Sequence, residues 1–178
     1  WDGWPAVVAA ARKGHKEVVE ALLRLGCDPN APNQHGQTAL MLAAFNGHGG
    51  VVGALLEHGG AELDAVDIGG MTALMWAARN GQAATAAQLV EAGADATLRA
   101  TGGTFEGKTA LEMAEEPEAD GPRRGGGSKA EVAALLRPAA EPGVRVPSPP
   151  LPPQPPAAAT APPGRCFRGS ALCSPGLI

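Results

Sequence analysis

The chain has 178 residues, a formal net charge of −4, 18% charged residues and 3% aromatic residues. The sequence lacks the dense basic stripe that nucleic-acid binding requires. It also contains no run of about 18 apolar residues that could cross a bilayer. Its three cysteines are too few for a disulfide framework, and no cluster of residues predicts a metal or cofactor site.

One phrase of nine residues recurs along the chain. It reads GQTALMLAA at 36–44 and GMTALMWAA at 70–78, a separation of 34 residues (70 − 36), and weaker copies lie at 3–11 and 107–115. A fixed period of this size indicates an array of one small unit stacked on itself. The repeat therefore predicts the architecture more strongly than any single residue does.

Each unit predicts two short helices joined by a tight turn. The recurring phrase opens a first apolar helix, which a glycine such as Gly14 or Gly47 ends, because glycine adopts the left-handed conformation that other residues avoid. A second helix with apolar residues at helical spacing follows, and segments 33–36 and 67–70 predict β-turns between units. Helices of about ten residues are marginal in isolation, so we expect alanine and leucine faces shared between units to stabilise the array.

The period divides a predicted repeat domain, residues 1–137, into units at about 1–33, 34–67, 68–100 and 101–137. The second unit has three glycines in or beside its second helix, so we expect it to be the least stable. The fourth unit is interrupted by a predicted flexible loop at 116–128, after which Ser128 caps a last helix from Lys129 to Arg137. Residues 138–178 predict a disordered, Pro-rich tail.

These phrases resemble the ankyrin repeat, whose common form is Gly-x-Thr-Pro-Leu-His-x-Ala-Ala followed by Gly-His, Val-Val, Leu-Leu and Gly-Ala-Asp. Gly47-His48, Val51-Val52 and Gly93-Ala94-Asp95 match it, and the resemblance covers about residues 2–116 well and 128–137 loosely. Alanine replaces the motif's proline and the motif's histidine is absent, so we expect looser turns and lower stability. The resemblance implies an all-α, ankyrin-type helix-turn-helix solenoid of about four repeats with β-turn tips.

One segment, residues 102–109, fits the phosphate-loop pattern G-x-x-x-x-G-K-[ST], in which loop amides and a lysine hold phosphates. Such a loop should follow a buried apolar strand, but residues 95–101 are mostly polar. Gly107 and Thr109 also have places in the repeat. Nucleotide binding is therefore the weaker alternative, an extended turn the stronger one, and we predict no catalytic residues.

The resemblance implies a non-catalytic module that binds a protein partner on its concave face, formed by the turn tips and the exposed side of the first helices. Carried onto this chain, the partner-binding candidates are Arg12, Gln34, His35, Phe45, Asn46, Val66, Ile68, Met71, Arg79, Asn80, Arg99 and Phe105. Phe45, Val66, Ile68 and Met71 are apolar at positions where water-facing residues are expected, which predicts an interaction patch unless some of them pack between neighbouring tips. Trp76 takes the place of Leu42 and is predicted to be core.

Several alternatives stay open at this level. The chain starts at Trp1, already inside the first repeat, so we expect the true N-terminus to be missing and consider a regulatory ankyrin segment of a larger enzyme. In the tail, Pro149-Pro150-Leu151-Pro152 resembles one class of WW-domain ligand, with a plain linker as the alternative. We expect an intracellular monomer, cytoplasmic or nuclear, that binds neither nucleic acid nor membrane.

Overall fold

The computed structural model describes residues 4–58, 60–116 and 128–139. These residues form eight α-helices and one 3₁₀ turn, and contain no strand beyond one isolated bridge between Arg99 and Thr109. The elements in chain order are α1 (Ala6–Lys13), α2 (Lys16–Arg24), α3 (Ala39–Asn46), α4 (Gly49–Glu57), α5 (Ala73–Arg79), α6 (Ala83–Glu91), η1 (Gly103–Phe105), α7 (Ala110–Glu115) and α8 (Lys129–Ala139).

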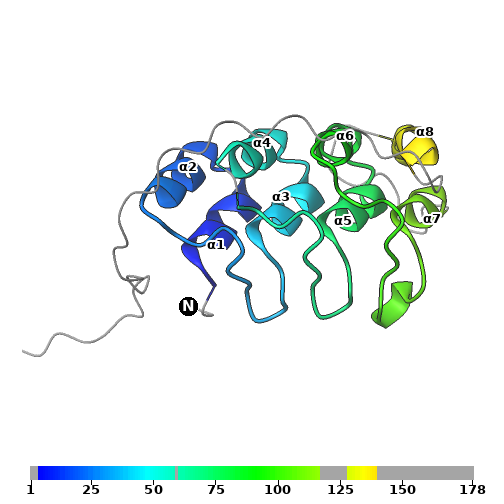
Figure 1. The fold of residues 1–178 in the computed structure, drawn as a ribbon, viewed down its shortest axis with the longest axis horizontal. Helices are drawn as coiled ribbons and strands as arrows, with labels where there is room; N and C mark the ends of the chain where they lie inside the picture. The colour runs from blue at the N-terminus through cyan, green and yellow to red at the C-terminus, as the bar shows by residue number, and fades with distance from the viewer. Residues whose placement is uncertain (1–3, 59, 117–127, 140–178) are drawn as a thin grey trace, which may run out of the picture.

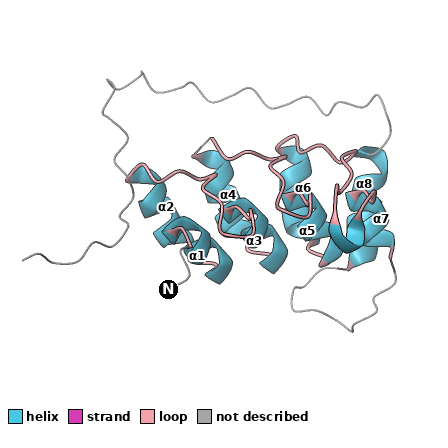
Figure 2. Cartoon of the chain, turned by 90° about the horizontal axis from the view of Figure 1, so that it is seen from below, coloured by secondary structure: helices cyan, strands magenta, loops and turns pink. Residues whose placement is uncertain are grey.

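The helices form two layers of parallel rows. Figure 1 shows α1, α3, α5 and α7 side by side in one row, the outer helices α2, α4, α6 and α8 in a second row above them, and long loops below the first row. We call α1, α3, α5 and α7 the inner helices and the bends of the long loops the tips. The view from below shows the same order along the stack (Figure 2). The predicted all-α solenoid is confirmed.

Threonine begins three of the inner helices. Thr38, Thr72 and Thr109 each accept a hydrogen bond from the backbone N–H three residues on, at 3.3–3.4 Å. At α7 the N–H of Thr109 donates in return to Glu112 Oε2 at 2.8 Å, which completes a capping box. That bond, with a smaller contribution from nearby Arg99, holds the pKa of Glu112 below its ordinary value of 4.5 although burial opposes the shift.

The tips are tied to one another by backbone hydrogen bonds. The N–H of Ile68 donates to the carbonyl of His35 at 3.2 Å, and the N–H of Gly102 donates to the carbonyl of Gly69 at 3.1 Å. Each bond joins one unit to the next. Neighbouring tips therefore keep a common spacing, although the described residues of the tips form no β-sheet.

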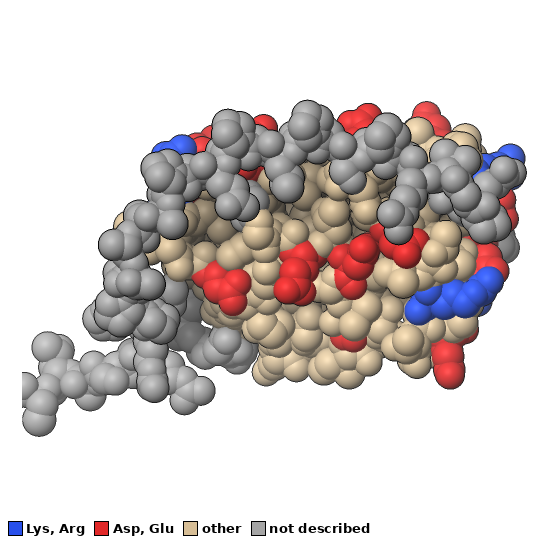
Figure 3. All heavy atoms as spheres, viewed as in Figure 1, with Lys and Arg blue, Asp and Glu red and all other residues tan. Residues whose placement is uncertain are grey.

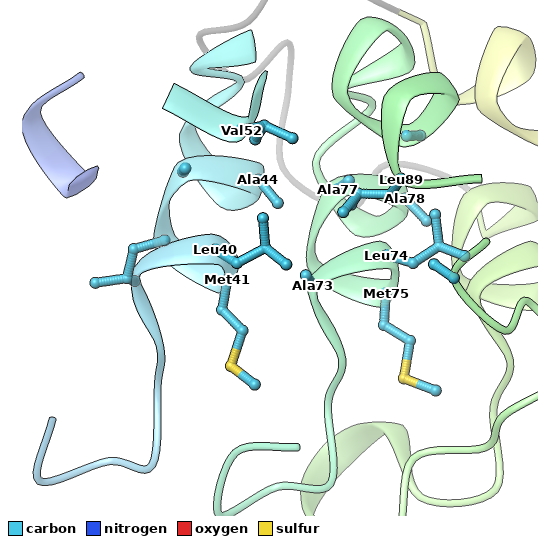
Figure 4. Packing of buried hydrophobic residues seen from close by; sticks show 14 of the residues in the cluster. Leu40, Met41, Ala44, Val52, Ala73, Leu74, Met75, Ala77, Ala78 and Leu89 are labelled. Atoms are coloured by element: carbon cyan, nitrogen blue, oxygen red, sulfur yellow. The ribbon is translucent and has the colours of Figure 1, made fainter. Parts of the chain in front are cut away.

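The core lies between the two layers and between successive units. Leu40, Leu55, Leu74 and Leu89 are almost completely buried, and Figure 4 shows Leu40 and Leu74 at equivalent places on successive inner helices. Alanine pairs such as Ala77 and Ala78 are fully buried, so helices approach closely without leaving voids. The expected Ala/Leu packing between units is thus present.

The last helix differs slightly from its prediction. It begins at Lys129 as expected but continues two residues past Arg137, through Pro138. Proline there removes one backbone donor close to the helix end, where few bonds remain to be lost. Most of the predicted loop at 116–128 and nearly all of the predicted tail at 138–178 lie outside the described residues.

Candidate functional site

Aromatic and cationic side chains from three successive units meet on the side of the stack where the tips lie. We call this set the aromatic row: Phe45, Trp76, Arg79, Phe105 and Lys108. Phe45 comes from the last turn of α3, Trp76 and Arg79 from α5, and Phe105 from η1. All five side chains are partly exposed. The row therefore runs across the units rather than along one helix.

Trp76 is the centre of the row; it packs against the core as predicted, but it is only partly buried. Its counterpart Leu42 is buried, but the larger indole overflows the same slot and reaches the surface. Phe45 meets the indole edge to face, with ring centroids 5.4 Å apart and planes at 72°. The indole Nε1 donates to Asp67 Oδ2 at 3.0 Å, so a tip carboxylate fixes the ring's orientation.

Arg79 joins Trp76 to Phe105. Its guanidinium carbon lies 5.4 Å from the Trp76 ring centroid and 4.5 Å from that of Phe105. Lys108 Nζ lies 5.7 Å from the Phe105 centroid. Cations over ring faces are attracted by the ring quadrupole, so the Arg79 contact holds the tip that carries η1 against the third unit.

The first unit repeats the pairing on a smaller scale. The guanidinium carbon of Arg12, in the last turn of α1, lies 5.2 Å from the Trp4 ring centroid. Arg12 and Arg79 occupy equivalent positions on α1 and α5, with Phe45 between them on α3. A cation, an aromatic ring and a second cation therefore follow one another along the inner helices.

The second tip exposes two apolar side chains, which we call the apolar tip. Val66 is 54% exposed and Ile68 is 77% exposed. Because the backbone of Ile68 is bonded to His35, the side chain is presented from a fixed position. Gln34 and His35 are exposed on the neighbouring tip. The alternative that Val66 and Ile68 pack between tips is therefore wrong.

Two predicted surface residues are buried. Met71 packs into the hydrophobic core at the start of the inner helix, so its expected exposure is wrong. Asn80 is also buried, and its Nδ2 donates to the carbonyl of Trp76 at 2.8 Å. Asn46 makes the same bond to Leu42, at 2.8 Å, and is half-buried. These asparagines satisfy helix-end carbonyls, which is a structural role.

The phosphate-loop segment is engaged in repeat contacts. Lys108 Nζ forms an ion pair with Glu116, and Thr109 caps α7. Arg99, although exposed, donates to the carbonyl of Gly107 and pairs with Glu112 at 3.3 Å. The described residues before the loop form no strand that could present it to a nucleotide. This geometry favours the extended turn over nucleotide binding.

Carboxylates gather on another part of the surface. Figure 3 shows acidic side chains in a row across the middle of the molecule. Exposed carboxylates follow the outer helices at Asp28, Glu62, Asp64 and Asp95, and residues 25–78 contain no lysine or arginine. Asp64 Oδ1 accepts from the N–H of Asp95 at 3.0 Å, so this carboxylate links neighbouring units. Its negative sign is unfavourable for a nucleic acid.

The part of the chain with described coordinates contains no group of three or more His, Cys, Asp or Glu side chains arranged to hold a metal ion. Over the same residues, every helix is too short or too polar to cross a bilayer.

Comparison with known proteins decides the family. The family model described as ankyrin repeats (3 copies) matches residues 6–100, which is more than half of the chain. The chain belongs to the ankyrin repeat family. The matched span runs from the start of α1 to just before η1, so α7 and α8 lie outside it although they pack on the ankyrin stack.

Individual relatives share a short part of the ankyrin region. The chain is 49% identical over 47 residues to the NAD-capped RNA hydrolase NUDT12 of Homo sapiens, covering 26% of this chain and 10% of the relative. It is 55% identical over 47 residues to the E3 ubiquitin-protein ligase XBAT33 of Arabidopsis thaliana, covering 26% and 9% respectively. The chain thus matches about a tenth of the length of these relatives.

The sequence does not predict the ring contacts of three surface residues. The sequence predicts Trp76 to be core, and it predicts no ring contact for Trp4 or Lys108. Two signals were available: a tryptophan stands where the neighbouring unit has a leucine, and Arg79 lies three residues later, on the same side of a helix. The contact with Phe105 had no such signal, because it depends on the shape of an irregular tip.

Proposed function

We propose that this chain is a non-catalytic ankyrin module that binds a protein partner on its concave face, the side formed by the inner helices and the tips. The observation that carries the proposal is the aromatic row beside the apolar tip. Tryptophan and arginine dominate the binding energy of protein interfaces, and exposed apolar groups flank them here. Family membership supports the same general role.

The surface is organised before any partner arrives. Trp76 is oriented by Phe45 and Asp67, and Arg79 is stacked between two rings. Ordering these side chains in advance reduces the entropy that association would otherwise cost. A partner segment with an apolar side chain against Ile68 and a carboxylate within reach of Arg12 would match this chemistry.

The first test removes the apolar tip. V66S/I68S should weaken binding of the partner about tenfold or more, because two exposed apolar anchors are lost. The measurement is quantitative affinity purification with the full chain as bait, followed by titration of the recovered protein. L135S, which changes a residue 40% exposed on α8, is the matched control. Proteins retained equally by V66S/I68S and the parent would contradict the concave-face assignment.

The variant F45S/I68S is a less selective test. Phe45 is partly buried against Trp76, so its loss should also lower the free energy of unfolding. Helical circular dichroism must therefore accompany the binding measurement. V66S/I68S avoids this ambiguity because both side chains point mostly into solvent.

A second candidate function is a regulatory ankyrin segment of a larger enzyme. The observation that favours it is that relatives named as an RNA hydrolase and a ubiquitin ligase match over about a tenth of their length. Mass spectrometry of the endogenous polypeptide tests it: peptides continuous with this chain and belonging to a catalytic domain would support it. An endogenous polypeptide without such a domain would exclude it.

The proposal extends to location and to the Pro-rich segment. We also propose that the partner lies inside the cell, in the cytoplasm or nucleus. Residues 149–152 would make a separate contact with a WW-type domain. Comparing affinity purification by residues 1–139 and by the full chain separates the two surfaces. Loss of a captured protein only when residues 140–178 are removed would assign that protein to the tail.

A further inference from the structure

In the first three units, charge is divided unequally between the two layers of the stack. The inner helices α1, α3 and α5 contain no aspartate or glutamate, and their cations are Arg12, Lys13 and Arg79. The outer helices α2, α4 and α6 contain the carboxylates of Glu17, Glu20, Glu57 and Glu91. A chain with a formal net charge of −4 thus keeps its carboxylates away from these inner helices.

One position of the repeat carries the contrast. The seventh residue after the N-cap of each inner helix is, in successive units, Arg12, Phe45, Arg79 and Glu116. In the fourth unit Lys108 forms an ion pair with Glu116, so that carboxylate is satisfied within the chain. We call the remaining three residues, Arg12, Phe45 and Arg79, the register row.

The register row faces solvent even where units lie on both sides of it. The inner helices lie in one row (Figure 1), in which α3 packs between α1 and α5, and α5 packs between α3 and α7. Phe45 and Arg79 nevertheless remain partly exposed, and Arg12 is exposed at the equivalent position. Solvent exposure is therefore a property of this position in the repeat, whatever lies beside α1.

A surface with a cation at each end and a ring between them is complementary to carboxylates that flank apolar groups. We propose that the partner segment is an extended acidic peptide, with one carboxylate at Arg12, another at Arg79, and apolar side chains over Phe45 and the apolar tip. This inference rests on the proposed function, because it names the chemistry of the partner on the same face. An extended segment suits the row because each unit contributes one side chain, as a strand does at every second residue.

The repeat fixes the spacing of the two carboxylates. Packed helices lie about 8–10 Å apart, so two units separate Arg12 from Arg79 by roughly 20 Å. An extended chain advances about 3.3 Å per residue and covers this span in about six residues. Side chains alternate between the two faces of a strand, so the first, third, fifth and seventh residues share a face. The partner pattern is therefore acid–x–apolar–x–apolar–x–acid.

Synthetic peptides test the spacing and the charge. The probe is Asp-Ser-Leu-Ser-Leu-Ser-Asp, acetylated and amidated to remove its terminal charges, and titrated into the full chain by isothermal titration calorimetry. We expect saturable binding that weakens as the salt concentration rises, because salt screens exposed charges. Two controls should bind at least tenfold more weakly. They are Lys-Ser-Leu-Ser-Leu-Ser-Lys and Asp-Ser-Leu-Asp-Leu-Ser-Ser, which has the composition of the probe with its aspartates three residues apart.

A double charge reversal tests the two arginines. R12E/R79E should bind the probe at least tenfold more weakly and should prefer the lysine peptide, because both contacts change sign. This reversed preference requires an intact surface, although R79E removes the ring contacts of Arg79. R12E alone keeps those contacts and should weaken binding of the probe about threefold. R24E/R137E changes the net charge equally at exposed arginines of α2 and α8, and should bind like the parent.

Three results would overturn the inference. They are a probe that shows no saturable binding up to millimolar concentration, a lysine peptide or spacing control that binds the parent as tightly as the probe, and an unchanged affinity of R12E and R12E/R79E for the probe. The proposed function fails by a different result, the retention of every captured protein by V66S/I68S. Captured proteins that V66S/I68S loses and R12E/R79E keeps would leave the concave face as the binding surface and exclude paired carboxylates as its ligand.

Discussion

At the scale of single residues, one turn position shows how a small chemical change links the scaffold to the binding surface. Asn33 Oδ1 accepts from the N–H groups of His35 and Gln37, each at 2.9 Å. Asp67, at the same place in the next tip, does the same for Gly69 and Met71. Only the carboxylate has a second oxygen free for the Trp76 indole. Aspartate thus ties the tip to the aromatic row.

Substitution of Asp67 separates these two roles. D67N should cost about 1 kcal/mol of unfolding free energy, because the turn bonds survive as they do at Asn33 while the indole bond is lost. D67A should cost about 2–3 kcal/mol, since it removes all three bonds. Urea unfolding followed by circular dichroism measures both. Equal losses in the two variants would mean that the indole bond contributes nothing separable.

At the scale of helices, α4 forms although three glycines lie in it. Gly49, Gly50 and Gly53 each have a lower helix propensity than alanine, so the sequence predicts that the second unit is the least stable. The helix persists because residues such as Val52 and Leu55 are completely buried against its neighbours. Tertiary packing therefore outweighs weak local propensity here.

Filling one of these glycines should stabilise the protein. A Cβ at Gly53 would meet no atom within 4 Å, so G53A should raise the unfolding free energy by about 1 kcal/mol. G47A is the contrasting change, because Gly47 has φ +73° and its Cβ would collide with the Gln82 side chain. Thermal unfolding compares the two. A destabilised G53A would show that α4 needs its glycines for a reason other than space.

At the scale of the whole molecule, stability depends on each unit being covered by the next. The matched family region ends at residue 100, yet α8 buries Val132 and Leu136 in the common core beside α6 and α7. The fourth unit is therefore completed by α8, which follows the undescribed residues 117–127 in the sequence. Among the described residues, α8 is the last helix of the stack, and it packs on α6 and α7.

Truncation tests this role of α8. A chain ending at Ala139 should unfold with the same free energy as the full chain. A chain ending at Glu116 should lose about 3 kcal/mol or more, because it exposes the apolar surface that Val132 and Leu136 cover. Amide hydrogen exchange should show α7 opening first in the shorter chain. Unchanged protection of α7 would mean that α8 is not a structural part of the stack.

The sequence by itself determined the helix pairs, the tips and their order, because these depend on local spacing: apolar residues at helical period, a threonine before each of three inner helices and a glycine after the first two. Such features need only near neighbours along the chain, and a repeat displays them several times over.

Only the tertiary structure decided which residues of the candidate surface reach solvent. Met71 and Asn80 are buried, whereas Trp76 emerges from a slot that buries leucine. Arg79 meets Phe105 across 26 residues of chain (105 − 79), and α2 exposes the same residue types that α4 buries. Burial depends on the volume of a side chain relative to its neighbours in space, and the amino-acid sequence does not state which residues those neighbours are.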